Sequence, residues 1–218
     1  MKMIRLKNFL LILNLLFLES IFQVNAQEAS SILDKAAETY EQSNGIKANF
    51  ALHSVVPEQN ISESYEGTIE MSKDKFKLTT PDMITWYNGE TQWVYVMRSE
   101  EVNVTTPGGD ELQFTNPAIL LKQYKKGFKA VYNGITTTQE AKSAYDIQLI
   151  PKIKKDIKQI DIQIDKISNL PASIRITDKK NAITTIHISQ WKTELNHSDS
   201  FFVFNEKDYP DAEIVDLR

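Results

Sequence analysis

Apolar residues recur at every second position over most of the chain. In 160–164 isoleucines alternate with aspartate and glutamine, and 65–71 alternates in the same way. This spacing gives a strand one apolar face. Similar runs lie at 46–56, 76–78, 83–87, 93–97, 101–105, 145–149, 171–176 and 183–191. We therefore predict a mainly β (α+β) fold of about ten strands, in one large antiparallel sheet that is curled or nearly closed.

Two segments break this period and predict helices. Residues 31–40 carry an apolar stripe at helical spacing, formed by Leu33, Ala36, Ala37 and Tyr40. The Asn-Gly pair at 44–45 supplies a stop signal. An Asn-Pro pair at 116–117 opens a short central helix through about residue 123, because proline suits the first helical position. This helix is apolar on more than one side, as a lid over a cavity would be.

Residues 80–97 concentrate large apolar side chains around the turn pair Asn88-Gly89, a strong hairpin signal. Trp86, Trp93 and Tyr95 have two interpretations. They pack an ordinary core, or they line a cavity, because curled sheets of about eight or more strands can enclose a ligand. Both faces of 93–97 are apolar, so the pattern does not choose between these interpretations.

The first 26 residues have the layout of a secretory signal peptide. Three basic residues precede an almost purely apolar run at 9–18, and small residues end the segment at Ala26. The run is about half of the ~20 residues that a membrane-spanning helix needs. We expect cleavage before Gln27, which leaves 27–218 as a single domain.

Charge and cysteine content restrict the classes of partner. Without Lys2, Arg5, Lys7 and Glu19, the chain has 22 basic and 28 acidic residues, a net charge of −6. This balance argues against nucleic acid, which requires a clustered basic face. There is no cysteine, hence no disulfide and no lipid-bearing cysteine after the signal. We expect a soluble protein of the bacterial periplasm.

The sequence offers no catalytic constellation. The three histidines, His53, His187 and His197, are far apart and lack the spacing of metal ligands. Nucleophile elbows, phosphate loops and calcium loops are absent from the sequence. Paired carboxylates such as 100–101 flank turns, where solvated loop charges explain them. We predict that the protein is not an enzyme and binds no cofactor or metal.

Seven segments extend this interpretation when they are taken in order: GIKANFALH, YEGTIEMSKDKFKLTTPD, WYNGETQWVYV, TNPAILLKQY, NLPASIRITDKKN, ISQWKTELNHSDSFFVF and YPDAEIVDLR. Together they resemble the periplasmic outer-membrane lipoprotein carrier family (LolA). The resemblance implies an unclosed β-barrel covered by a helical lid. It further implies a monomeric chaperone that takes acylated lipoproteins from an inner-membrane ABC transporter complex to an outer-membrane acceptor.

This resemblance implies an apolar cavity that holds acyl chains. We expect its lining among Phe50, Ile69, Met71, Phe76, Leu78, Met83, Trp86, Trp93, Tyr95, Ile119, Leu120, Ile147, Leu149, Ile174, Ile176, Ile186 and Ile188. The family's Arg-Pro pair, whose arginine holds the lid closed, is replaced here by Met71-Ser72-Lys73-Asp74. Lysine lacks the planar fork of arginine, so no lid-latching residue is carried over.

Three other functions fit parts of the sequence. A periplasmic sensor of lipids or lipoproteins has the same fold and signals to a membrane partner. An enzyme acting on lipids requires polar groups that converge inside the cavity. A purely structural β-domain has a filled core and no cavity.

Overall fold

The computed structural model describes residues 26–108, 112, 117–153 and 156–218. Among them, residues 26–41 form an N-terminal helix. The remaining elements are β1 (Ile46–Val56), η1 (Pro57–Gln59), β2 (Ile61–Ser72), β3 (Lys75–Thr79), β4 (Met83–Tyr87), β5 (Gln92–Val96), β6 (Glu101–Thr105), α3 (Pro117–Gly127), β7 (Phe128–Thr137), β8 (Ser143–Pro151), β9 (Ile157–Asp165), β10 (Pro171–Asp178), β11 (Ile183–Thr193), η2 (Asp199–Phe202), η3 (Glu206–Asp208) and β12 (Glu213–Asp216).

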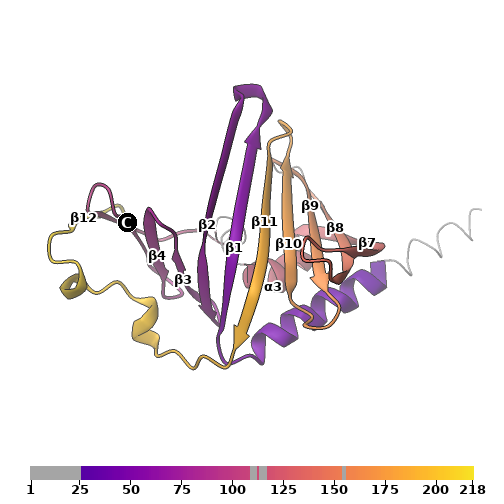
Figure 1. Cartoon of the computed structure of the whole chain (residues 1–218), viewed down its shortest axis with the longest axis horizontal. Helices are drawn as coiled ribbons and strands as arrows, with labels where there is room; N and C mark the ends of the chain where they lie inside the picture. Colours follow the sequence, from indigo (N-terminus) through magenta and orange to yellow (C-terminus); the bar gives the residue numbers. More distant parts are fainter. Residues whose placement is uncertain (1–25, 109–111, 113–116, 154–155) are drawn as a thin grey trace, which may run out of the picture.

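All twelve strands belong to one sheet in the order β12-β6-β5-β4-β3-β2-β1-β11-β10-β9-β8-β7. Neighbouring strands are antiparallel except β12, which runs parallel to β6. The two edge strands do not pair, so the curved sheet stays open (Figure 1). The predicted fold class, an unclosed antiparallel sheet with an N-terminal and a central helix, is therefore confirmed.

The strand count exceeds the predicted ten because β7 and β12 were not expected. β7 includes Gly134 with positive φ and mixes polar with apolar residues, so its period is weak. β12 is short and mostly exposed, and it joins the sheet through backbone pairing with β6. Backbone pairing of this kind leaves little trace in a hydrophobic pattern.

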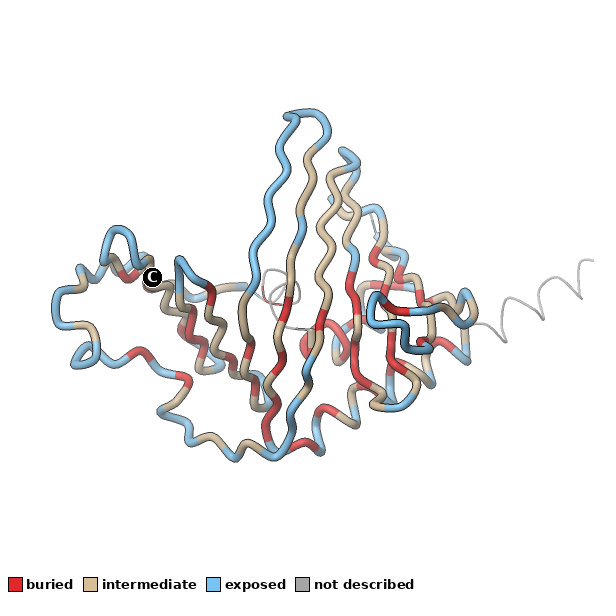
Figure 2. Tube along the Cα trace, viewed as in Figure 1, coloured by how far each residue is buried: buried red, intermediate tan, exposed pale blue. Residues whose placement is uncertain are grey.

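The core lies on one face of the sheet and under both helices. Buried side chains of the N-terminal helix, such as Leu33 and Tyr40, pack in one cluster with α3 and with the inward-facing isoleucines of β9. The N-terminal helix lies under the lower ends of the strands (Figure 2). Buried positions alternate along β9 at residues 160, 162 and 164. The helix ends as the sequence predicts, because Asn44 and Gly45 both adopt positive φ, 48° and 104°.

The opposite face of β8 to β11 is polar. A groove of about 630 Å³ lies there between the strands and the β7–β8 connection. Asp161 accepts hydrogen bonds from the side-chain amides of Gln148 and Gln159. Burial and the neighbouring Asp161 carboxylate raise the pKa of Asp146 above its usual range. Asp146 therefore disfavours its charged form in the folded state.

We expect Asp146→Asn to stabilise the protein at pH 7 by less than about 1 kcal/mol, because the site is partly exposed. The folded-state pKa is raised, so ionising Asp146 costs stability as the pH rises through that pKa. The gain should vanish below about pH 3, where this carboxyl is protonated in the folded and unfolded states. Urea unfolding at pH 7 and below about pH 3 measures this gain in stability. An equal gain at both pH values would contradict the raised pKa of Asp146.

Candidate functional site

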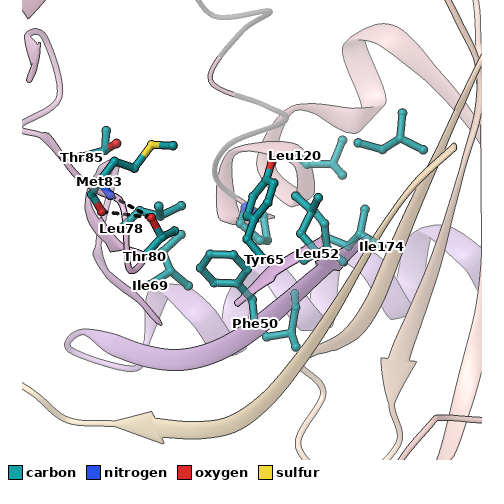
Figure 3. A pocket seen from close by; sticks show the side chains of 14 residues that line it. Phe50, Leu52, Tyr65, Ile69, Leu78, Thr80, Met83, Thr85, Leu120 and Ile174 are labelled. Carbon is teal, nitrogen blue, oxygen red and sulfur yellow. Dashed lines mark hydrogen bonds between the residues drawn. The ribbon is translucent and has the colours of Figure 1, made fainter. Parts of the chain in front are cut away.

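A cavity of about 230 Å³ opens between the inner face of the sheet and the beginning of α3 (Figure 3). Six strands contribute to its wall: β1, β2, β3, β4, β10 and β11. Its lining is almost entirely apolar and consists of Phe50, Leu52, Tyr65, Ile69, Leu78, Thr80, Met83, Thr85, Pro117, Leu120, Ile174, Ile176, Ile186 and Ile188.

Strand register assembles this wall from residues that are distant in sequence. Ile174 pairs with Ile186, Ile186 with Leu52, and Leu52 with Tyr65, which makes one row across β10, β11, β1 and β2. Paired residues point to the same face of a sheet, so the row presents four side chains to the cavity. The sequence forms this row because each strand keeps its apolar residues in phase.

A second row ends in a glycine for steric reasons. Ile188 pairs with Phe50, and Phe50 pairs with Gly67. A Cβ atom at Gly67 would collide with the carbonyl oxygen of Thr79 and lie 2.8 Å from Cζ of Phe50. Glycine thus lets the Phe50 ring lie flat on β2 and shape the cavity floor.

Gly67→Ala is expected to lower the free energy of unfolding by about 1–3 kcal/mol, the usual cost of overpacking. The cause is the collision with the Thr79 backbone, which cannot rotate away. Thermal unfolding measures the change. Gly127→Ala is the matched control, because its added Cβ meets no heavy atom within 4 Å. Equal melting temperatures for the two variants would contradict this packing.

One of the few polar groups at the cavity, the Thr80 hydroxyl, is paired with the neighbouring backbone. The Thr80 hydroxyl donates to the carbonyl of Met83 (3.2 Å) and accepts from its backbone N–H (3.1 Å). No charged side chain lines the cavity within the described part of the chain. Tyr65 and Met83, 42% and 37% exposed, lie where the cavity meets solvent. The site therefore suits an apolar ligand that enters past these two side chains.

Helix α3 is fastened at its C-terminal half and reaches the cavity with its first turns. Lys125 pairs with Asp34 of the N-terminal helix at 2.7 Å, and Lys122 pairs with Asp74 of the β2–β3 turn at 3.2 Å. Burial raises the pKa of Tyr124, whose neutral hydroxyl donates to Ser30 O and to Asp34 at 3.4 Å each. Exposed ion pairs of this kind contribute only about 0–1 kcal/mol each.

The structure brings together nine of the seventeen side chains that were expected to line a cavity: Phe50, Ile69, Leu78, Met83, Leu120, Ile174, Ile176, Ile186 and Ile188. Five others are buried in the core without reaching the cavity surface: Met71, Phe76, Ile119, Ile147 and Leu149. Leu52, Tyr65, Thr80, Thr85 and Pro117 line the cavity and were not expected. The two-residue period of a strand could have identified Leu52 and Tyr65, because each lies an even number of residues from an expected lining residue of its strand.

Trp86, Trp93 and Tyr95 lie on the other face of the sheet instead. In β4, Met83 and Thr85 face the cavity, so Trp86 must point away from it. Trp93 is paired with Trp86 and therefore shares that face. A second cluster forms there, separate from the main core.

The C-terminal segment covers this second cluster. The rings of Phe204 and Tyr209 each lie 5.6 Å from the Trp86 ring, and Tyr209 lies 4.6 Å from Tyr95. Trp86 is consequently only 3% exposed. These aromatic residues fasten the chain end to the sheet, and their packing accounts for the apolar hairpin.

Metal clusters and membrane-spanning helices are both missing from the described part of the chain. Its residues contain no group of three or more histidine, cysteine, aspartate or glutamate side chains that could hold a metal ion. Within the same residues, no helix has the length and apolar character required to cross a membrane.

Most of the chain matches one known family. The model of the family described as "Outer membrane lipoprotein carrier protein LolA" matches residues 19–180. No curated protein sequence matches the chain.

The chain is similar to solved structures at low sequence identity. An uncharacterized conserved protein from Thermus thermophilus is 12% identical with a TM-score of 0.59, covering 87% of this chain and 99% of its own. A DUF1329 family protein from Desulfovibrio piger is 11% identical with a TM-score of 0.50, covering 82% and 97%. A "putative outer membrane lipoprotein-sorting protein domain" from Vibrio parahaemolyticus is 9% identical with a TM-score of 0.47, covering 82% and 97%.

Proposed function

Because the chain belongs to the LolA family of outer membrane lipoprotein carrier proteins, we propose that it binds the acyl chains of lipoproteins and carries them between membranes. The cavity carries this proposal. Its wall is built from aliphatic and aromatic side chains, without a charged group among the described residues. An acyl chain needs such a wall and needs nothing else from it.

The cost of exposing acyl chains to water favours a carrier that covers them. Each exposed CH₂ group costs about 0.8 kcal/mol in water, so an anchor with several acyl chains cannot cross an aqueous gap uncovered. A wall without specific polar contacts holds varied chains and releases them to a more apolar acceptor. Transfer then follows differences in affinity, and the carrier itself consumes no energy source.

Loading requires the cavity to widen. A volume of about 230 Å³ is below the ~300–1,000 Å³ usual for drug-sized ligands, and an anchor with several chains is larger than these. Helix α3 is the element that moves in this proposal, because Leu120 lines the cavity while exposed ion pairs fasten the helix elsewhere. Helix α3 thus acts as the lid, although this chain lacks the arginine that holds the lid closed in the family.

The cellular setting belongs to the same proposal. Residues 1–26 act as a cleaved signal, and 27–218 work as one monomeric domain in the periplasm. The donor is an inner-membrane lipoprotein-releasing ABC transporter complex, and an outer-membrane acceptor receives the cargo. The hydroxyls of Tyr65, Thr80 and Thr85 are the polar groups at the cavity, which supports binding rather than catalysis.

A transfer assay tests the carrier function. Donor vesicles contain a fluorescent triacylated lipopeptide, and acceptor vesicles contain a quencher. The mature protein should accelerate quenching in proportion to its concentration and should elute with the lipopeptide as a one-to-one soluble complex. A protein that forms the complex yet never accelerates transfer would contradict the carrier role and favour a sensor.

A further inference from the structure

The two halves of β2 differ in their neighbours. Thr68–Ser72 pair with β3 on one side and with β1 on the other. Residues 61–67 pair with β1 alone among the described residues, and at the lower end of this stretch Gly67 lies against the Thr79 backbone of β3. The upper part of β2 stands clear of β3 in Figure 1. Every residue carries backbone hydrogen-bonding groups, so this stretch has a free edge, with respect to the described residues, that offers the donors and acceptors of a strand.

Glu63 and Glu66 are the charged residues of this free edge, and the other features that usually protect an edge strand are missing from it. Its sequence, ISESYEG, has neither proline nor lysine. The register with β1 runs without a bulge from Ile46↔Met71 to Val56↔Ile61. β1 is itself paired with β11 as far as Val55, which supports the edge from behind. All side chains of 61–66 are exposed, so the edge is accessible.

The free edge also borders the mouth of the cavity. Tyr65 belongs to it and lines the cavity, with its ring directed toward the space beside Leu120 (Figure 3). Ile69, further along β2 and on the same face, belongs to the same wall and is buried. A polypeptide attached to a ligand in the cavity can therefore leave past Tyr65, beside residues 61–67.

We propose that the free edge of 61–67 binds the extended polypeptide segment next to the acyl chains, as an added strand. This inference rests on the proposed carrier function and names a second contact with the same cargo. Seven residues of strand span about 23 Å, so a segment of about seven residues covers the edge. Strand addition uses main-chain hydrogen bonds, so it accepts segments of many sequences, as a general carrier requires.

Charge argues against a second copy of this chain at the edge. Residues 57–67 contain Glu58, Glu63 and Glu66 and no basic residue. Pairing of two such strands would bring like charges together, which destabilises a sheet. A neutral or basic cargo segment meets no such repulsion.

Hydrogen–deuterium exchange of the mature protein tests the proposal with two probes. One is a triacylated cysteine followed by a neutral seven-residue peptide, and the other is the triacylated cysteine amide without a peptide. Both should slow exchange around Ile186 in the cavity wall. Only the first should slow exchange in 61–67, by on the order of tenfold, as one net hydrogen bond per protected site would.

A matched pair of probes separates main-chain pairing from simple coverage. Two further lipopeptides carry backbone N-methyl groups at odd or at even peptide positions. One of them should lose the protection of 61–67, because its donors toward the edge are gone, while the cavity amides stay protected. Equal exchange of 61–67 with and without the peptide would overturn the inference alone. Unchanged exchange around Ile186 with every probe would overturn the carrier function as well.

Discussion

Ile186→Glu should lower the affinity for a triacylated lipopeptide by more than about 100-fold. Ile186 lies in the middle of the row that crosses four strands, between Ile174 and Leu52. A carboxylate there would lose its water to the bound acyl chain, which costs several kcal/mol without a partner. Each 1.4 kcal/mol is a factor of ten in the dissociation constant. Isothermal titration measures the loss directly.

Thr185→Glu is the matched control for this charge. Thr185 is the preceding residue of β11 and points to the polar face, opposite Arg175. The same carboxylate is solvated there, so affinity should remain within about threefold of the unmodified protein, which is below 1 kcal/mol. Circular dichroism confirms that both variants fold. Equal affinities for the two variants would show that acyl chains bind elsewhere.

Trp86→Ala should lower the free energy of unfolding by about 3–5 kcal/mol and leave the lipopeptide affinity unchanged. The indole is almost completely buried between the sheet and the C-terminal segment, where it contacts Phe204 and Tyr209. Its removal opens a cavity that these rings cannot fill. For a domain of this length the melting temperature falls by about 2–4 °C per kcal/mol.

Phe204→Ala gives an independent check on the second cluster. The Phe204 ring stacks on Tyr209 at 5.5 Å and meets the Trp86 ring edge-on at 5.6 Å, so the two substitutions remove parts of one set of contacts. The double variant should lose less free energy of unfolding than the two single variants lose together, because contacting residues are coupled. Two results would contradict the packing of Trp86 in the second cluster. One is full additivity of the two losses, and the other is a loss of lipopeptide affinity in Trp86→Ala with stability unchanged.

Sequence periodicity predicts the face of a strand only where the two faces differ. In β9 the isoleucines at 160, 162 and 164 alternate with polar residues and all face the core, as the pattern requires. In 93–96 both faces are apolar, because the outer one is covered by the chain end. That cover comes from a tail whose apolar residues, such as Phe204 and Tyr209, are separated by charges. The pattern therefore could not assign Trp86 and Trp93 to a side.

The cavity depends on information that a single strand does not contain. Ile186 and Tyr65 share a row because of strand register across β11, β1 and β2. Register follows from pairing partners, which are set by the whole sheet. The free edge of 61–67 arises because β2 is longer than β3, and the sequence shows the length of neither strand clearly.

Native mass spectrometry of the protein recovered from the cells that produce it distinguishes a loaded carrier from an empty protein. We expect a one-to-one complex with a protein whose mass includes several acyl chains, and the loss of this species in Ile186→Glu but not in Thr185→Glu. A protein recovered with free lipids alone, or without any ligand and unable to take up an added triacylated lipopeptide, would contradict the carrier function.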